Sequence, residues 1–354
     1  MGIYDISGRL LTDTSICYDS EPQAPYWIFH LDCARKWFTI ANVKSLIDSC
    51  YSSGLNQIEL HFSENEGFRL ALADMTVSAN GTTYDLTPCL GGVESPNNWY
   101  TQSNMDEIIA YAQSKGIDVV PSFDMPGHMG RILSIFTQFK MNNTNTLDIK
   151  NSAAVNFAKA VVDKYAKYFV SRGCHFYNIG YDEIMGYGVG FPQLYSNGDF
   201  QYVVDFANGL FEVVESNGLK PRAFNEVFYY AQDYKYYTSK DAQVLYWTNA
   251  IPNSDEASPA ALQTFGYQLI NSNHDWYWVL GNPTISVTAE TLRNADVLKG
   301  FAENTLPHNG YGAMFCVWCD STSTQSGDGG AGVVASVTPL IQAFGVAIQN
   351  ALNS

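Results

Sequence analysis

Short apolar runs rich in β-forming residues alternate with helix-like patterns along most of this chain. Eight runs predict strands, at 27–33, 56–62, 118–123, 175–179, 222–225, 243–247, 267–271 and 312–318. Seven segments between and after them predict helices, at 41–53, 105–115, 153–171, 202–217, 258–264, 289–299 and 333–352. Alternation of this kind is typical of parallel strands joined by right-handed crossovers. It constrains the fold more than any other feature and predicts an α/β protein.

Eight strand–helix units predict a (β/α)8 barrel, the TIM-barrel architecture. An open doubly wound sheet is the alternative, but that fold places a glycine-rich phosphate-binding turn after its first strand. Here the motif D-C-A-R-K at 32–36 follows the first strand, so polar and charged groups occupy the turn. Because barrel active sites lie at the C-terminal ends of the strands, the residues just after each strand are the functional candidates.

The eight units account for residues 26–354 as one barrel domain, and residues 1–25 are predicted to be a leader or linker. A length of 354 residues fits either two average domains or one barrel, so length alone does not decide. The N-terminus lacks a basic region followed by an apolar stretch, and no run of about 18 apolar residues occurs. We therefore expect no membrane insertion. The compartment stays open, because a removed signal peptide would leave the same sequence.

The charge balance excludes some partners. The chain has 35 acidic and 19 basic residues, a formal net charge of −16. This charge repels phosphates and anionic lipid headgroups, so we expect no nucleic-acid partner. Only 15% of the residues are charged, which leaves a surface rich in neutral polar groups and suited to a neutral polar ligand.

Neither the cysteines nor the histidines predict a metal or redox site. The seven cysteines are scattered, and the C-x-x-C motif of Cys316 and Cys319 lacks the second cysteine pair of a zinc site. The six histidines show no H-E-x-x-H spacing. We therefore expect no metal and no cofactor.

Acidic, aromatic and amide residues gather at the predicted strand ends. Aromatic faces stack on the apolar faces of sugar rings, while carboxylates, amides and arginine hydrogen-bond the hydroxyls. The mixture therefore predicts a carbohydrate pocket, although a single tryptophan of this kind is equally compatible with core filling. The residues concerned are Asp32, Arg35, His61, Glu64, Glu66, Asp124, His128, Asp182, Glu183, Asn225, Glu226, Trp247, Asp275, Trp276, Tyr277, Trp278, Trp318 and Asp320.

The adjacent acids Asp182 and Glu183 stand out among these residues. Neighbouring carboxylates raise each other's pKa, so one can stay protonated as a general acid while the other is ionised. Both point into the barrel mouth only where the strand gives way to a loop. A solvated surface pair is the alternative, and Gly180 at the end of an apolar run favours the functional interpretation.

Seven motifs, in order along the chain, resemble glycoside hydrolase family 20, the β-N-acetylhexosaminidase family. They are L-D-C-A-R at 31–35, L-H-F-S-E-N-E-G-F-R at 60–69, D-M-P-G-H at 124–128, G-Y-D-E at 180–183, Y-W at 246–247, W-Y at 276–277 and W-C-D at 318–320. The resemblance covers the chain from residue 27 to the C-terminal helix. It implies a (β/α)8 barrel, in agreement with the strand–helix pattern.

The resemblance implies hydrolysis of β-linked N-acetylhexosamines with retention, using the 2-acetamido group of the substrate as nucleophile. Glu183 would be the general acid and then the base. Asp182 would orient the acetamido group and stabilise the oxazolinium intermediate, and Tyr277 would donate to its carbonyl oxygen. The partner is then an N-acetylhexosamine-containing oligosaccharide or glycoconjugate, and a secreted or cell-surface location is expected.

The remaining site residues are implied in the same way. Aromatic residues would wall the acetamido pocket, Arg35 would reach the 3- and 4-hydroxyls and Asp320 the 4- or 6-hydroxyl. His128 and Asp124 would hold Glu183. The full substrate-binding set is Arg35, His61, His128, Asp124, Phe224, Trp247, Trp276, Trp318 and Asp320.

Several departures from the family pattern bear on the substrate. Asn178 and Tyr181 replace common family residues, and Glu64 stands where an aspartate usually partners the histidine. Asp320 is one methylene shorter than the usual glutamate, which favours a lacto-N-biosidase that releases a disaccharide. Arg35 favours instead exo removal of a single N-acetylhexosamine, and we rank this activity above the lacto-N-biosidase activity.

A sugar-binding barrel that has lost its acid is the main non-enzymic alternative, and the intact Asp182, Glu183 and Tyr277 argue against it. Many members of the family carry an N-terminal α+β domain before the barrel. Since only residues 1–25 precede the barrel here, we expect a single-domain member or a trimmed chain.

Overall fold

The computed structural model describes residues 2–4, 10–13, 25–142, 144–184, 190–231, 236–248, 257–297, 310–322 and 327–353. Of the predicted leader at 1–25, it describes β1 (Gly2–Tyr4) and β2 (Leu10–Asp13), which pair antiparallel, and residue 25. The remainder of that segment, and residues 298–299 of the helix predicted at 289–299, lie outside the described residues.

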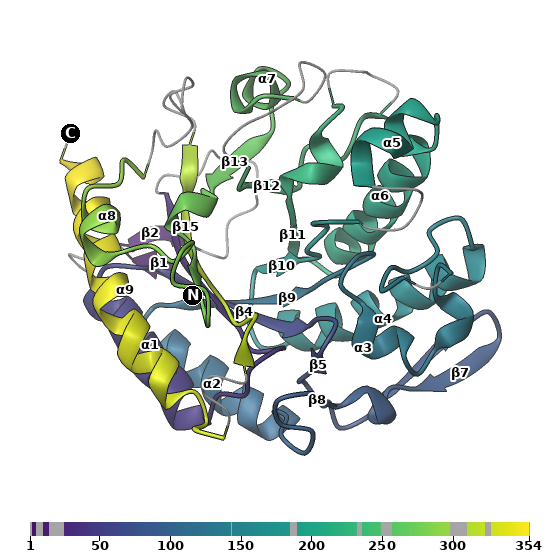
Figure 1. The fold of residues 1–354 in the computed structure, drawn as a ribbon, viewed down its shortest axis with the longest axis horizontal. Coiled ribbons are helices and arrows are strands. Elements are labelled where there is room, and N and C mark those ends of the chain that lie inside the picture. The colour runs from purple at the N-terminus through teal and green to yellow at the C-terminus, as the bar shows by residue number, and fades with distance from the viewer. Residues whose placement is uncertain are drawn as a thin grey trace.

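Eight parallel strands close into a barrel at the centre of the molecule (Figure 1). Each strand pairs with the next one in chain order, and the last pairs with the first through Gly312↔Tyr26 to Val317↔Leu31. The predicted (β/α)8 fold and its strands are therefore confirmed. The strands are β3 (Tyr26–Asp32), β4 (Gln57–Ser63), β9 (Asp118–Phe123), β10 (Phe176–Asn178), β11 (Lys220–Phe224), β12 (Gln243–Tyr246), β13 (Gln268–Asn271) and β15 (Gly310–Trp318).

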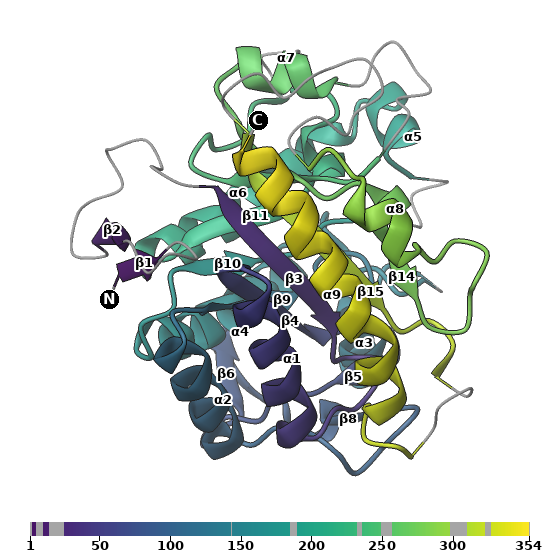
Figure 2. The ribbon, with the colours of Figure 1, turned by 90° about the vertical axis from the view of Figure 1, so that its left-hand side faces the viewer.

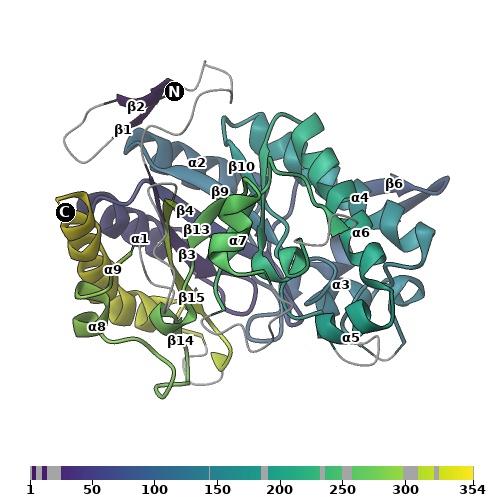
Figure 3. The same ribbon diagram turned by 90° about the horizontal axis from the view of Figure 1, so that it is seen from above.

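Helices surround the barrel, as Figures 1 and 3 show. After β11, the described residues form a 3-10 helix, η3 (Asn225–Phe228), at the start of the connection to β12. The α-helices are α1 (Ile40–Ser52), α2 (Gln102–Ser114), α3 (Gly130–Leu133), α4 (Ser152–Val170), α5 (Gly190–Ser196), α6 (Phe200–Ser216), α7 (Pro259–Thr264), α8 (Ala289–Arg293) and α9 (Ala331–Leu352).

The connection from β4 to α2 carries an insertion that we did not predict. It contains β5 (Gly67–Phe68), the hairpin β6 (Thr76–Ala79) and β7 (Thr82–Asp85), η1 (Thr87–Cys89) and β8 (Gly91–Gly92). Asn80 and Gly81 connect the hairpin strands with positive φ values of 55° and 73°. Asn-Gly in such a turn is a strong hairpin signal, because both residues tolerate the left-handed conformation.

Inside the barrel, hydrogen bonds between buried polar side chains join strands that are not neighbours. Asn178 on β10 donates to Glu59 on β4, and Arg222 on β11 donates to Gln57 on β4, both at 2.8 Å. Arg222 also donates to Gln243 on β12 at 2.8 Å. The first two of these bonds tie β4 to β10 and to β11 across the interior of the barrel.

The C-terminal helix α9 runs alongside α1 (Figure 2). It is the one helix among the described residues that is long and apolar enough to span a membrane, with a mean hydropathy of 1.8. Half of that stretch is buried inside the protein, where Ile341, Phe344 and Ile348 join the core. A core helix of a soluble protein has the same properties, so the helix alone is weak evidence for insertion.

Candidate active site

A pocket opens at the C-terminal ends of the barrel strands, where the sequence predicts the site. Its lining contains nine of the twelve predicted site residues and two apolar residues that were not predicted. The lining residues are Arg35, His128, Asp182, Glu183, Phe224, Trp247, Tyr277, Val279, Ile285, Trp318 and Asp320.

The acid pair lies on a tight turn directly after β10. Gly180, Tyr181 and Glu183 have positive φ values of 72°, 79° and 46°, a conformation that costs free energy in residues other than glycine. Glycine is required at position 180, because a Cβ there would lie 1.8 Å from Oδ1 of Asp124. Tyr181 is buried, and its hydroxyl donates to the backbone oxygen of Val203. The turn brings both acids of the pair to the pocket, which a continuing strand would not do.

His128 links the acid pair to Glu64. Its Nδ1 lies 2.7 Å from Oε1 of Glu64, and its Nε2 lies 3.4 Å from Oε2 of Glu183 and 3.8 Å from Oδ2 of Asp182. Burial alone would lower the pKa of His128, but the surrounding carboxylates Asp182, Glu183 and Glu64 raise that pKa well above 6.5. The surrounding carboxylates therefore favour the protonated, positively charged imidazole.

At Glu183 the pKa shift runs opposite to the one that repulsion within the pair alone would produce. The contact with His128 lowers the pKa of Glu183, whose side chain is 58% exposed. Burial raises the pKa of Asp182, although the charge of His128 opposes that shift. A positively charged His128 therefore counteracts, at Glu183, the repulsion between the two acids.

Arg35 fills one end of the pocket within a group of carboxylates. Its Nη1 lies 2.8 Å from Oδ2 of the buried Asp32 and 3.6 Å from Oδ1 of Asp320, and its Nη2 contacts Glu64. The charge of Arg35 outweighs burial and lowers the pKa of Asp32 to about 2. These ion pairs hold the guanidinium in place, and Asp320, with a side chain 52% exposed, stays available to a ligand.

Aromatic rings form another part of the lining, and the guanidinium of Arg35 lies 5.7 Å from the ring centroid of Trp318. The rings of Trp247 and Tyr277 are nearly parallel, at 15° with centroids 6.4 Å apart, and Trp318 lies 6.1 Å from Tyr277 and 6.2 Å from Phe224. Burial raises the pKa of Tyr277 well above 10, so its hydroxyl, 3.2 Å from Oγ of Ser272, remains a donor. The wall combines apolar faces with one fixed hydrogen-bond donor.

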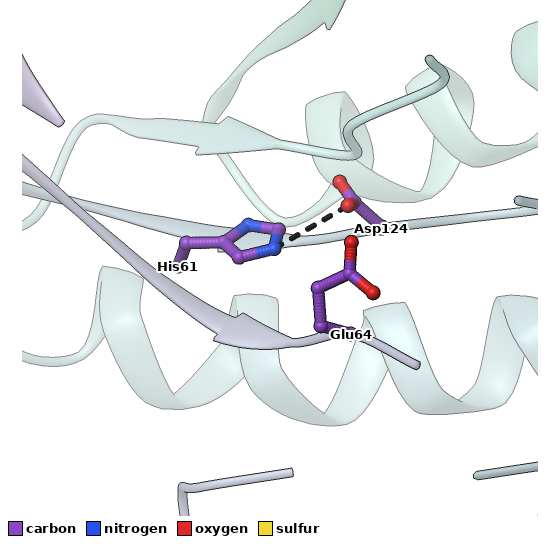
Figure 4. A group of neighbouring side chains, drawn as sticks. All are labelled: His61, Glu64 and Asp124. Atoms are coloured by element: carbon purple, nitrogen blue, oxygen red, sulfur yellow. Dashed lines mark ion pairs between the residues drawn. The ribbon is translucent and has the colours of Figure 1, made fainter. Parts of the chain in front are cut away.

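His61 and Asp124 lie beneath the pocket and do not line it, although the sequence analysis placed them among the substrate-binding residues. Nε2 of His61 is 3.3 Å from Oδ2 of Asp124, with Glu64 beside them (Figure 4). Burial lowers the pKa of His61 well below 6.5, and burial together with the charge of Asp182 raises the pKa of Asp124. Both groups therefore tend toward their neutral forms.

The same three residues are the one group within the described ranges whose donor atoms are close enough to share a metal ion. The atoms lie within 4.8 Å of one another. Glu64, however, already contacts the guanidinium of Arg35 and the imidazole of His128. Because these cations would repel a divalent ion, the donor set fits a metal poorly.

Trp276 corrects the predicted list. It is 5% exposed and packs against Phe344 of α9, with ring centroids 6.1 Å apart, so it belongs to the core. It ends the 3-10 helix η5 (His274–Trp276), and the next residue, Tyr277, lines the pocket. The W-Y motif therefore contributes one core residue and one site residue.

Two apolar residues of the lining were not predicted, and Glu226 was predicted only as one of the strand-end residues, without a specific role. Val279, at the end of β14 (Trp278–Val279), and Ile285 add an apolar rim. A single apolar residue after a strand carries no distinctive signal. Glu226 stands at a predicted strand end, and the structure places its carboxyl between Glu183 and Trp247, with hydrogen bonds to both.

The barrel, with an acid pair and an aromatic wall at its strand ends, defines a glycoside hydrolase. Residues 25–297 match the catalytic domain of Glycosyl hydrolase family 20. The chain belongs to this family, as the sequence motifs predicted.

Curated relatives carry two kinds of name. The chain is 26% identical over 252 residues to a lacto-N-biosidase of Bifidobacterium bifidum. The aligned region covers 65% of this chain and 22% of that protein. It is 32% identical over 144 residues to a beta-hexosaminidase of Vibrio vulnificus, covering 36% of this chain and 17% of that protein. The matched regions thus span about a fifth of the length of each relative.

Solved structures agree with the fold. One of the tandem GH20 catalytic modules of the pneumococcal exo-beta-D-N-acetylglucosaminidase StrH superposes with a TM-score of 0.82 and 27% identity, over 93% of this chain and 83% of that one. Dispersin B superposes with a TM-score of 0.70 and 22% identity, over 91% of this chain and 98% of that one, a likeness in fold.

Proposed function

We propose that this protein is a retaining exo-β-N-acetylhexosaminidase, which removes a terminal β-linked N-acetylglucosamine or N-acetylgalactosamine. The observation that carries the proposal is the pocket end formed by Arg35 and Asp320, together with the acid pair in the same pocket. A guanidinium held by ion pairs beside an exposed carboxylate suits the free hydroxyls of a terminal sugar. A further sugar attached to one of those hydroxyls would collide with the guanidinium of Arg35.

In the proposed reaction the acetamido group of the sugar is the nucleophile. Asp182 accepts a hydrogen bond from its N–H, and the hydroxyl of Tyr277 donates to its carbonyl oxygen, which turns that oxygen toward C1. Glu183 protonates the glycosidic oxygen as the C1–O bond breaks and the acetamido oxygen bonds to C1. The carboxylate of Asp182 then stabilises the cationic oxazolinium, and the aromatic wall excludes water from the methyl group.

The proton for this step comes from His128. Nε2 of the protonated imidazole lies 3.4 Å from Oε2 of Glu183, so the proton can pass to the carboxylate when a bound substrate removes water from it. Glu64, at Nδ1, stabilises the imidazolium until then. After the leaving group departs, Glu183 is a carboxylate again and accepts a proton from the water that attacks C1.

A lacto-N-biosidase is the second candidate, and two observations favour it. The Bifidobacterium bifidum relative carries that name and covers 65% of this chain, and the short, half-exposed side chain of Asp320 leaves room at the pocket rim. The reaction would be the same, with galactose on the 3-hydroxyl and a disaccharide as product.

A paired assay separates the two candidates. The protein is incubated with the 4-nitrophenyl β-glycosides of N-acetylglucosamine and of lacto-N-biose, and release of 4-nitrophenol is measured. We expect release from the first substrate and at least tenfold slower release from the second. Release from the disaccharide alone would favour the lacto-N-biosidase, and release from neither would contradict both candidates.

The proposed role of Asp182 makes a further prediction. Replacement of Asp182 by Asn should lower kcat by about 10²- to 10³-fold and change KM much less, because the carboxylate acts mainly on the cationic transition state. The same substitution should weaken binding of a thiazoline mimic of the oxazolinium, measured as an inhibition constant. An effect confined to KM would refute this role.

A further inference from the structure

Glu226 is a buried carboxyl that the proposed reaction does not use. It lies in the first turn of η3, directly after β11, and is 3% exposed. Its Oε1 accepts a hydrogen bond from the backbone N–H of Glu183 at 3.2 Å, and its Oε2 accepts one from Nε1 of Trp247 at 2.9 Å. One side chain thus joins the end of β10 to the end of β12, across the strand that lies between them.

Both partners need such support. Glu183 has a φ of 46°, a strained conformation for glutamate, and its exposed side chain has little packing to fix it. Trp247 is half-buried and lies over Tyr277, so a rotation of its indole would open the acetamido wall. The side-chain oxygen of the neighbouring Asn225 accepts a hydrogen bond from the backbone N–H of Trp247 at 3.0 Å, which fixes the backbone of Trp247. The hydrogen bond to Glu226 fixes the indole.

We infer that Glu226 is a positioning residue that sets the general acid and the wall of the acetamido pocket in one fixed geometry. The inference rests on the proposed function, since it needs Glu183 to be the acid and Trp247 to be a wall. Without the two hydrogen bonds the substrate still enters the pocket. The acid and the acetamido group are then misaligned relative to C1, which affects the chemical step more than binding.

Glu226→Gln tests the inference, because an amide has only one acceptor oxygen. It can accept from the backbone N–H of Glu183 or from the indole of Trp247, and it presents an N–H group to the other donor. On 4-nitrophenyl β-N-acetylglucosaminide we expect kcat to fall about tenfold or more, with KM changed less than threefold and the thermal midpoint within a few degrees of wild type. Glu212→Gln, which removes an exposed carboxylate on α6, is the matched control and should match wild type in both parameters.

Trp247→Phe removes the indole donor and keeps a ring in the wall, so it provides an independent arm even if Glu226→Gln does not fold. We expect kcat to fall in this variant as well, and the loss in the double variant to be smaller than the product of the two single losses. The inference is overturned if kcat is unchanged in either folded single variant. It is also overturned if the losses of the two single variants multiply fully in the double variant, or if a smaller folded fraction accounts for the loss of kcat. An inactive wild type would instead overturn the proposed function, and the inference with it.

Discussion

At the scale of single residues, the local backbone turn decides which side chain at a strand end reaches the pocket. Arg35, Asp182 and Glu183 line the pocket, whereas Asp124, which is also polar and also follows a strand, lies beneath it. Two adjacent aromatic residues cannot be told apart in this way. Trp276 faces the core and Tyr277 the pocket, and that difference depends on the 3-10 turn η5, which sequence periodicity does not reveal.

The proton on His128 makes the pH profile a test at this scale. Because the pKa of His128 is raised well above 6.5, the histidine–glutamate pair keeps its proton at pH values where a free histidine has lost it. The acid is lost as pH rises through the raised pKa. In a His128→Asn variant, Glu183 must hold the proton alone. The basic limb of kcat/KM should therefore move to lower pH. Asparagine is suitable because it tolerates the φ of 53° at this position.

His175→Asn is the control for that experiment. His175 precedes β10 at the other end of the barrel, where its Nδ1 lies 3.1 Å from Asp118, and its replacement should leave the profile unchanged. A basic limb that stays in place in the His128 variant would show that the proton of the general acid has another source.

At the scale of elements, sequence reasoning located the barrel strands because each is a short buried run between turn residues. It missed the β6–β7 hairpin, although Asn80-Gly81 between two short strands was a readable signal. It also could not foresee which charges are buried between elements. Lys36 is fully buried, and its Nζ lies 2.8 Å from Oδ1 of Asp328, just before α9.

Asp328 should therefore stabilise the docking of α9. Its carboxylate accepts from the backbone N–H groups of Gly330 and Gly332, at 2.9 and 2.8 Å, besides pairing with Lys36. We expect Asp328→Ala to lower the free energy of unfolding by about 2–4 kcal/mol, because it removes a helix cap and a partner of a buried ammonium. Urea unfolding measures this change.

The matching control is Lys167→Gln, which breaks an exposed pair with Asp163 on α4. Surface pairs of this type contribute little, so its unfolding free energy should stay within about 0.5 kcal/mol of wild type. A similar loss of unfolding free energy in both variants would mean that the ion pair of Asp328 with the buried Lys36 contributes no more to stability than an exposed pair does.

At the scale of the whole molecule, the closed barrel brings residues from distant parts of the chain to one rim. Arg35 and Asp320 are separated by most of the sequence, yet their side chains lie 3.6 Å apart, because β15 pairs with β3. The strand count was enough to predict this closure. The same closure gathers acids at the rim, including Glu66 and Glu183, in a chain of net charge −16.

The sign of that charge predicts how the protein discriminates between leaving groups. A neutral 4-nitrophenyl aglycone does not interact with the field, whereas one that carries a carboxylate is repelled on approach. Raising the salt concentration from about 0.02 to 0.5 M shortens the Debye length from roughly 20 to 4 Å and screens the repulsion. The kcat/KM for the carboxylated substrate should therefore rise severalfold, while that for the neutral one should change less than about twofold. The neutral substrate is the internal control for general salt effects on the protein. An equal response of both substrates would mean that local cations such as Arg35 dominate the potential at the pocket mouth, and that the acidic excess does not act on the substrate.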